Sequence, residues 1–384
     1  MHFEFATANR IIFGCGTIKE VSPLAAHMGS RALVITGSTV ARAAGLIEQL
    51  QNHGVHVITF QVPSEPTTDI IIEGTTLARI EKCDLVIGIG GGSVIDAGKA
   101  ISALITNYGD LFDYLEVIGR AQPITIPPAP YIAIPTTAGT GTEVTKNAVI
   151  ISAKHKVKVS MRSPLMLPEL VVVDPELTYS MPQAVTASTG LDALTQLMEA
   201  FVTLKANPLI DGICREGLVR AARSIKAAYE DGSNTSARED MALASLFSGI
   251  ALANAGLGAV HGFAAPLGGE FDAPHGVICA RLLPIVMETN VLALNGRNPQ
   301  STALMRYDEL ARILTGKSHA GAQDGVSFIQ ELCKELNIPG LSSIGLTPDD
   351  IPEIVSKARR ASSMKGNPIE LTENELSDIL KKSL

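Results

Sequence analysis

The first half of the chain alternates short apolar runs with segments in which apolar residues recur at helical spacing. Residues 31–37 and 55–60 have the continuous apolar character of buried strands, and residues 39–54 between them have the period of a helix. A second helical pattern near 68–81 precedes another strand-like run at 84–92, which leads into a glycine turn and a further helix. This strand–helix–strand order is typical of a doubly wound, mainly parallel sheet.

The pattern changes in the second half of the chain. Residues 121–143 are rich in proline, glycine and threonine, and we expect them to bring the chain back across a cleft. From about residue 181 the apolar spacing is helical to the end. A chain of 384 residues also exceeds the size at which one hydrophobic core usually stops growing. We therefore predict an α/β domain over residues 1–180 and an all-α domain over residues 181–384.

Composition narrows the class of protein. Hydrophobic residues make up 46% and charged residues 18% of the chain, which is enough apolar material for sizeable cores. The net charge of −8 gives no general attraction to nucleic acid or to an anionic membrane. No run of roughly eighteen apolar residues and no secretory pattern at the N-terminus are present. The five cysteines are scattered without a CxxC pair, so we expect reduced thiols and a cytoplasmic protein.

A glycine turn lies between a predicted strand and a predicted helix at residues 88–100. Its glycines and the following Ser93 would let backbone N–H groups approach a pyrophosphate at the start of the helix. The turn lacks the GxGxxG pattern and the lysine of a P-loop, and a turn required only by sterics is the alternative. Residues 135–143 add four threonine hydroxyls that could bind ribose or phosphate. Together the two segments predict a dinucleotide site at the edge of the sheet.

A possible metal site begins on the segment 189–201. We expect a helix there, with Thr189 as its N-cap. Asp192 and Gln196 are four residues apart, so they share one face of that helix and present a carboxylate and an amide oxygen on it.

Two histidines later in the chain complete the candidate metal site. His261 and His275 each precede a glycine in a segment with few charges, and both could meet Asp192. An aspartate with two histidines suits Zn²⁺ or Fe²⁺ and leaves positions for a substrate oxygen. Histidines that are merely hydrogen-bonded in a core are the alternative. Cys279 follows His275 by four residues, and we favour a buried, inert thiol over a contact with the metal.

Taken in order, these motifs resemble the iron-dependent (group III) alcohol dehydrogenase family over most of the chain. The resemblance is carried by residues 90–100, 134–145, 168–178 and 189–194 and by the two histidine segments. It implies an N-terminal dinucleotide-binding domain, a C-terminal helical domain and a metal in the cleft between them. The cofactors that it implies are NAD or NADP and a divalent metal, Fe²⁺ or Zn²⁺.

The resemblance also assigns roles to individual residues of this chain. It places three metal ligands at Asp192, His261 and His275. It assigns the pyrophosphate to Gly91, Gly92 and Ser93, with Asp96 nearby. The remainder of the nucleotide would be lined by Thr136, Thr137, Thr140 and Thr142, and Lys158 would reach the nicotinamide ribose.

The chain departs from the family at three positions. Gln196 replaces the histidine that is the family's fourth metal ligand, so we expect a lower metal affinity or a shifted metal preference. Ala265 replaces a histidine that faces the reacting centre in many members, which leaves the route of the proton open. Gly37 replaces the aspartate with which NAD-selective members repel a 2′-phosphate, so NADP becomes acceptable.

These inferences predict reversible hydride transfer between NAD(P) and a small alcohol or aldehyde, with the metal polarising the reacting oxygen. We expect no nucleic-acid or membrane partner and, from the resemblance, a homo-oligomer. The alternatives are a polyol oxidoreductase like glycerol dehydrogenase, a lyase resembling dehydroquinate synthase, and a catalytically impaired nucleotide-binding homologue.

Overall fold

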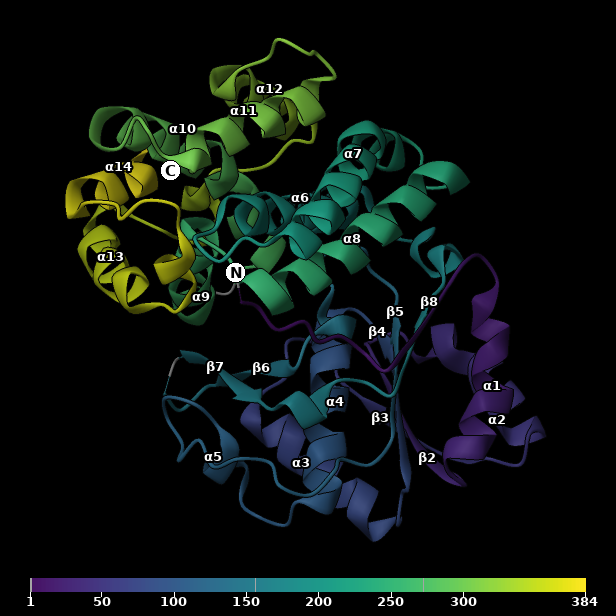
Figure 1. The fold of residues 1–384 in the computed structure, drawn as a ribbon. Helices are drawn as coiled ribbons and strands as arrows, with labels where there is room; N and C mark the ends of the chain where they lie inside the picture. The colour runs from purple at the N-terminus through teal and green to yellow at the C-terminus, as the bar shows by residue number, and fades with distance from the viewer. Residues whose placement is uncertain (1, 156, 272) are drawn as a thin grey trace. The chain divides into compact units, whose positions relative to one another are not determined.

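The computed structural model describes residues 2–155, 157–271 and 273–384 (Figure 1). These residues form two compact units. One unit consists of Ala6–Thr137 and Gly141–Tyr179, and the other consists of the N-terminal residues up to Phe5, Ala138–Thr140 and Ser180–Leu384. We describe each unit by itself.

The first unit is built on a six-stranded parallel sheet with the strand order β1-β8-β5-β4-β2-β3. The strands of this sheet are β1 (Arg10–Phe13), β2 (Arg31–Thr36), β3 (His56–Gln61), β4 (Leu85–Gly90), β5 (Tyr131–Pro135) and β8 (Leu170–Val173). The prediction of a mainly parallel, doubly wound sheet is confirmed.

Helices cover both faces of this sheet. α1 (Val21–Met28) and α2 (Ala44–Asn52) lie on one face, and α3 (Thr68–Ile80) and α4 (Gly92–Thr106) lie on the other (Figure 1). All six residues of β4 are buried, which explains why this strand is apolar without alternation. A short helix, α5 (Leu111–Tyr114), completes the helices of the unit.

Two local features differ from the sequence-based expectation. The helix expected over 39–54 begins as a 3₁₀ turn at Val40–Ala43 and becomes α-helical only in α2. An antiparallel hairpin, β6 (Asn147–Ser152) and β7 (Val157–Arg162), was not predicted. In β6, buried and half-buried side chains alternate, as expected for a strand with one face packed on the unit.

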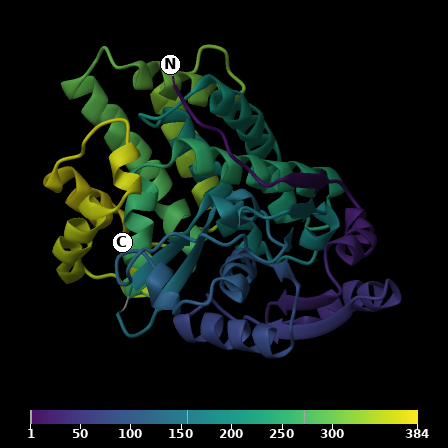
Figure 2. The same cartoon turned by 60° about the horizontal axis from the view of Figure 1, so that its bottom comes forward.

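The second unit is helical, as predicted, and its described residues contain no strand. Its helices are α6 (Gln183–Val202), α7 (Pro208–Glu230), α8 (Thr235–Ala255), α9 (Ala259–Glu270), α10 (His275–Arg297), α11 (Thr302–Thr315), α12 (Ala322–Glu335), α13 (Ile351–Arg360) and α14 (Glu373–Ser383). The last two helices pack against each other, in yellow in Figure 1 and Figure 2.

The start of α6 corrects one prediction. Thr189 is not an N-cap, because α6 begins six residues earlier at Gln183, with Pro182 in the capping position. The Thr189 hydroxyl instead donates 2.8 Å to the carbonyl oxygen of Val185, one turn back. Such internal bonding lets a threonine occupy a helix interior, so its presence alone did not locate the helix start.

Helix α10 is long and apolar enough to cross a membrane, and α8 with α9 would pass the same criterion as a pair bent by 99°. Within the structure, however, 72% of the apolar window of α10 is buried. This burial is the property of a core helix, and it places α10 in the packed interior of the helical unit.

Candidate metal and nucleotide sites

Three helices of the helical unit bring the predicted metal-binding side chains together. Asp192 lies on α6, His261 is the third residue of α9, and His275 is the first residue of α10. Oδ1 of Asp192 is 3.4 Å from Nε2 of His261 and 3.7 Å from Nε2 of His275. The two imidazole rings have their centroids 5.4 Å apart. One carboxylate oxygen therefore faces both imidazoles.

The glycine after His275 explains how the start of α10 comes so close to α6. A Cβ atom at Gly276 would lie 2.5 Å from the carbonyl oxygen of Ser188, a contact that real Cβ atoms essentially never make. Only glycine therefore allows the backbone of α10 to approach α6 at this point. This approach brings His275 next to Asp192, one turn beyond Ser188 on α6.

The buried oxygens of this cluster indicate a cation site. Asp192 and Gln196 are 1% and 2% exposed. Asp192 Oδ1 and Gln196 Oε1 both lack a hydrogen-bond partner among the described residues. Leaving buried oxygens unpaired costs free energy unless something else satisfies them, and a metal ion bound between them would do so. The donor set thus fits a divalent cation.

The two neighbouring histidines favour the ionised form of Asp192. Burial opposes ionisation of Asp192, but the neighbouring His275 and His261 hold the pKa of this carboxyl below its ordinary value. Asp192 is therefore a carboxylate at neutral pH, the form in which it binds a metal.

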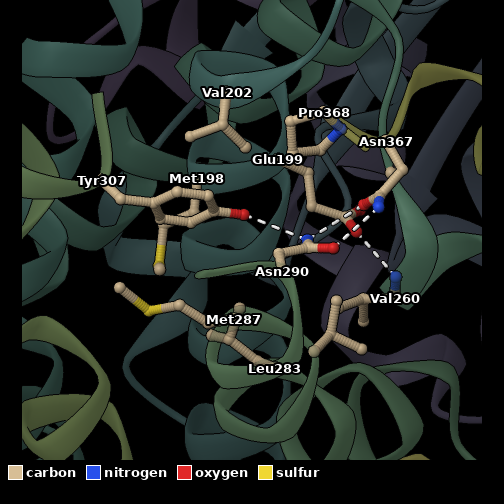
Figure 3. A pocket seen from close by; sticks show the side chains of 12 residues that line it. Met198, Glu199, Val202, Val260, Leu283, Met287, Asn290, Tyr307, Asn367 and Pro368 are labelled. Carbon is tan, nitrogen blue, oxygen red and sulfur yellow. Dashed lines mark hydrogen bonds between the residues drawn. The ribbon is translucent and has the colours of Figure 1, made fainter. Parts of the chain in front are cut away.

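Glu199 is a residue that the sequence analysis missed. It lies on α6 one turn after Gln196, and its carboxylate accepts a bond of 2.7 Å from Nδ1–H of His261. It accepts a second bond of 2.7 Å from N–H of Val260 (Figure 3). Because Nδ1 donates to Glu199, Nε2 of His261 keeps its lone pair for the cluster. The signal in the sequence was a carboxylate seven residues after Asp192 and three after Gln196, a spacing that puts all three on one side of the helix.

A polar network lies beside Glu199 in the interior of the helical unit. The Asn290 side-chain amide donates hydrogen bonds of 3.0 Å to the Tyr307 hydroxyl and of 3.0 Å to the Asn367 side-chain oxygen (Figure 3). The Asn367 amide in turn donates a bond of 2.7 Å to the side-chain oxygen of Asn290. These residues line a pocket of about 20 Å³, large enough for a water molecule. The side chains around Glu199 are thus fixed by mutual hydrogen bonds.

The predicted glycine turn lies in the α/β unit, between β4 and α4. Gly91 is at the N-cap of α4, and Gly92 and Ser93 are its first two residues. A Cβ at Gly90 would lie 2.5 Å from the Val94 side chain, so the turn is too tight for another residue. No side chain among the described residues caps this helix start, which leaves its N–H groups for an anion.

Asp96 takes part in a buried network instead of facing outward from the turn. It accepts a bond of 2.5 Å from the Thr142 hydroxyl and one of 3.1 Å from N–H of Val149, and it forms an ion pair of 2.9 Å with Lys99. The fully buried Lys99 also donates to Thr142 and Thr145. Asp96 and Thr142 therefore tie α4 to the segment that leads into β6, and Lys99 was not recognised from the sequence.

The other residues predicted to bind the nucleotide lie on several separate elements of the fold. Gly37 directly follows β2, and Thr136 donates its N–H to the Gly90 carbonyl over 2.9 Å. Thr137 packs against Gly91, whose Cβ would lie 3.4 Å from its methyl group. Lys158 is on β7 and pairs with Glu65 at 2.5 Å, and Thr140 groups with the helical unit.

Comparisons with known proteins agree over the whole chain. The family model described as iron-containing alcohol dehydrogenase matches residues 8–175, and the model of the family's C-terminal part matches residues 186–384. The 1,3-propanediol dehydrogenase of Klebsiella pneumoniae is 34% identical over 390 residues, covering 99% of this chain and 98% of that protein. The choline dehydrogenase of Bacillus subtilis is 34% identical over 387 residues, covering 99% of this chain and 94% of that protein.

A solved structure is also similar to this chain over its full length. The crystal structure of a 1,3-propanediol oxidoreductase superposes with a TM-score of 0.92 at 33% identity, covering 100% of both chains. With both family models matched and full-length relatives above 30% identity, the chain belongs to the iron-containing alcohol dehydrogenase family.

Proposed function

We propose that Asp192, His261 and His275 hold the divalent cation of this alcohol dehydrogenase, with Gln196 as a further oxygen donor. Family membership makes the chain a metal-dependent oxidoreductase that uses NAD(P) and acts on an alcohol or aldehyde. The observation that carries the proposed site is the buried, unpartnered Asp192 oxygen that faces two imidazoles, with a second buried, unpartnered oxygen at Gln196, one turn along α6. We propose Fe²⁺ or Zn²⁺ as the metal, since both accept this donor set.

When bound, the cation would supply Lewis acidity toward the oxygen of the alcohol or aldehyde. The protein supplies the position of the ligands. Asp192 contributes a negative charge that is 1% exposed. Glu199 fixes the orientation of the His261 ring and keeps its Nδ1 protonated. Ala265, on the same helix as His261, offers no titratable group, so we propose that a water or a hydroxyl of the substrate carries the proton.

On the α/β unit, we propose that Gly91, Gly92 and Ser93 bind the pyrophosphate of NAD or NADP. The uncapped start of α4 supports this role, because its N–H groups and dipole attract an anion. Thr136, Thr137, Thr140 and Thr142 would line the nucleotide, and Lys158 would face the nicotinamide ribose; Asp96 would act through Thr142. The hydride itself is the chemistry of the cofactor.

The proposed organisation assigns residues 1–180 to nucleotide binding and residues 181–384 to metal and substrate binding. As substrate we propose a small primary or secondary alcohol or the matching aldehyde. Diols belong among the substrates to be tested, because several relatives are named for 1,3-propanediol. We further propose a cytoplasmic homo-oligomer.

Removal of the metal tests the proposed function. We expect purified protein to oxidise at least one small alcohol or diol with NAD or NADP, in a panel assayed with parallel metal analysis. Stripping the metal with a chelator should abolish turnover, and Fe²⁺ or Zn²⁺ should restore it. Metal-loaded protein that turns over no alcohol or aldehyde would instead identify a catalytically impaired, nucleotide-binding homologue.

Gly37→Asp is expected to impair the use of NADPH. A Cβ at this position would lie 3.9 Å from its nearest neighbour, a methyl group of Val94, so a side chain fits. A carboxylate there would repel a 2′-phosphate and accept a bond from a 2′-hydroxyl. We expect kcat/KM for NADPH to fall at least about tenfold, with NADH unaffected or improved. Gly37→Asn, which adds similar bulk without charge, is the control, and equal losses in the two variants would argue against this role of Gly37.

Glu199→Gln is expected to weaken metal binding. The substitution keeps the size of the side chain but removes the charge that pairs with Nδ1–H of His261, and changes of this kind typically cost about 10–100-fold in metal affinity. Competition with a chromophoric chelator measures this loss. Glu216→Gln, on the exposed side of α7, should leave the affinity unchanged. An unaltered affinity in Glu199→Gln would show that the bond to His261 does not support the metal.

A further inference from the structure

The sulfur of Cys279 lies inside the proposed metal cluster. Cys279 follows His275 by one turn of α10, and its Sγ atom is 3.6 Å from Nε2 of His275 and 3.7 Å from Nε2 of His261. Together with Asp192, these residues place four potential ligand atoms within 4.8 Å of one another. The Cys279 side chain is fully buried, so its sulfur does not contact solvent.

Four of the six spacings among the donor atoms, those between sulfur and nitrogen and between nitrogen and oxygen, are close to the values of a tetrahedral site. With metal bonds of about 2.3 Å to sulfur and about 2.0–2.2 Å to nitrogen and oxygen, tetrahedral angles place sulfur and nitrogen about 3.6 Å apart and nitrogen and oxygen about 3.4 Å apart. The two observed sulfur–nitrogen distances are 3.6 and 3.7 Å. The two nitrogen–oxygen distances are 3.4 and 3.7 Å.

Charge also favours sulfur as a ligand. Asp192 supplies one negative charge, two neutral imidazoles supply none, and the amide of Gln196 supplies none. A divalent cation held by these groups alone would keep a net positive charge within its own set of ligands, and the nearest further negative charge would be the Glu199 carboxylate behind His261. A thiolate at Cys279 supplies the second negative charge at the position where the geometry already places it.

We propose that the Cys279 thiolate is a metal ligand together with Asp192, His261 and His275, and that it directs the site toward Zn²⁺ over Fe²⁺. As the sulfur–metal bond forms, the thiol proton passes to water. A thiolate in a tetrahedral set with nitrogen donors is characteristic of zinc. Zinc can accept a fifth ligand, so this set leaves one position that either the amide oxygen of Gln196 or a substrate oxygen would occupy. The inference rests on the proposed metal site and adds a donor to it.

Cobalt substitution tests the ligand without reference to activity. Full-length protein freed of metal is loaded with one equivalent of Co²⁺, and the near-ultraviolet band of thiolate-to-cobalt charge transfer is recorded. We expect the band in the wild type and in Cys333→Ser, which alters another buried cysteine of the same unit. In Cys279→Ser and Cys279→Ala the band should be absent, and chelator competition should show Zn²⁺ affinity lowered at least about tenfold.

Metal selection is measured in the same proteins. Offered equal Fe²⁺ and Zn²⁺ without oxygen, the wild type should retain mostly zinc, and Cys279→Ser should shift toward iron. Wild-type protein that binds one Co²⁺ without the sulfur band would overturn the inference, and this result requires no variant to fold. A wild type that binds no Co²⁺ would overturn the proposed metal site as well. A sulfur band in a protein without dehydrogenase activity would leave the ligand in place and reject only the proposed function.

Discussion

Replacing Asp192 by alanine is expected to lower kcat/KM for alcohol oxidation by at least about three orders of magnitude and to remove most of the bound metal. Asp192 is the only carboxylate within reach of both imidazoles among the described residues, and it is 1% exposed. Loss of Lewis-acid stabilisation worth about 4 kcal/mol corresponds to this factor. Steady-state kinetics and elemental analysis of the purified variant measure the two effects.

A matched variant separates chemistry from folding. Asp192→Asn keeps the shape of the side chain and an oxygen donor but removes the charge, so it should retain some metal and remain strongly impaired. Both variants should bind NAD(P)H like the wild type, because the proposed nucleotide-binding residues at the start of α4 belong to the other compact unit. If Asp192→Ala kept a full complement of metal and turned over alcohol within threefold of the wild type, the proposed ligand set would be wrong.

Lys99→Met is expected to destabilise the α/β unit by about 3–5 kcal/mol. The Lys99 ammonium is fully buried, and burial lowers its pKa while Asp96 opposes this shift. Methionine fills a similar volume but leaves the Asp96 carboxylate without its cation. Removing one partner of a buried ion pair is costly because the other charge remains in the interior. Denaturant unfolding, followed by a probe in the α/β unit, measures the loss.

The double variant Asp96→Asn/Lys99→Met should recover part of that stability, since it leaves no unpaired charge. Lys19→Met, at an exposed lysine of the same unit, should change the stability by less than about 0.5 kcal/mol. A loss below about 1 kcal/mol in Lys99→Met would mean that the network around Asp96 contributes little to the unit.

The sheet and most helices of the first unit could be predicted because their apolar patterns are strong. Residues 85–90 are apolar without interruption since β4 is buried on both faces, and α3 was expected within one residue of its observed end. The hairpin of β6 and β7 was missed because β6 has polar residues only at its two ends and follows a loop rich in glycine and threonine, although apolar and polar residues do alternate along β7. Local pattern alone did not distinguish this hairpin from the loop.

The candidate site could be predicted only in part. Residue types and the family resemblance selected Asp192, His261 and His275, but their distances depend on the packing of three helices. Glu199 was missed and Cys279 was set aside because a carboxylate or a thiol between apolar residues of a helix usually has no role at a metal site. Both lie at helical spacing from a predicted ligand, on α6 and α10 respectively, and this spacing is the signal that the sequence contains.

A crystal structure of the metal-loaded enzyme with NAD(P), with data collected at the absorption edge of the metal, tests the central claim most directly. We predict a single anomalous peak within bonding distance of Asp192, His261 and His275. A peak bound by other residues, or an active enzyme in which these three side chains contact no metal, would contradict the account.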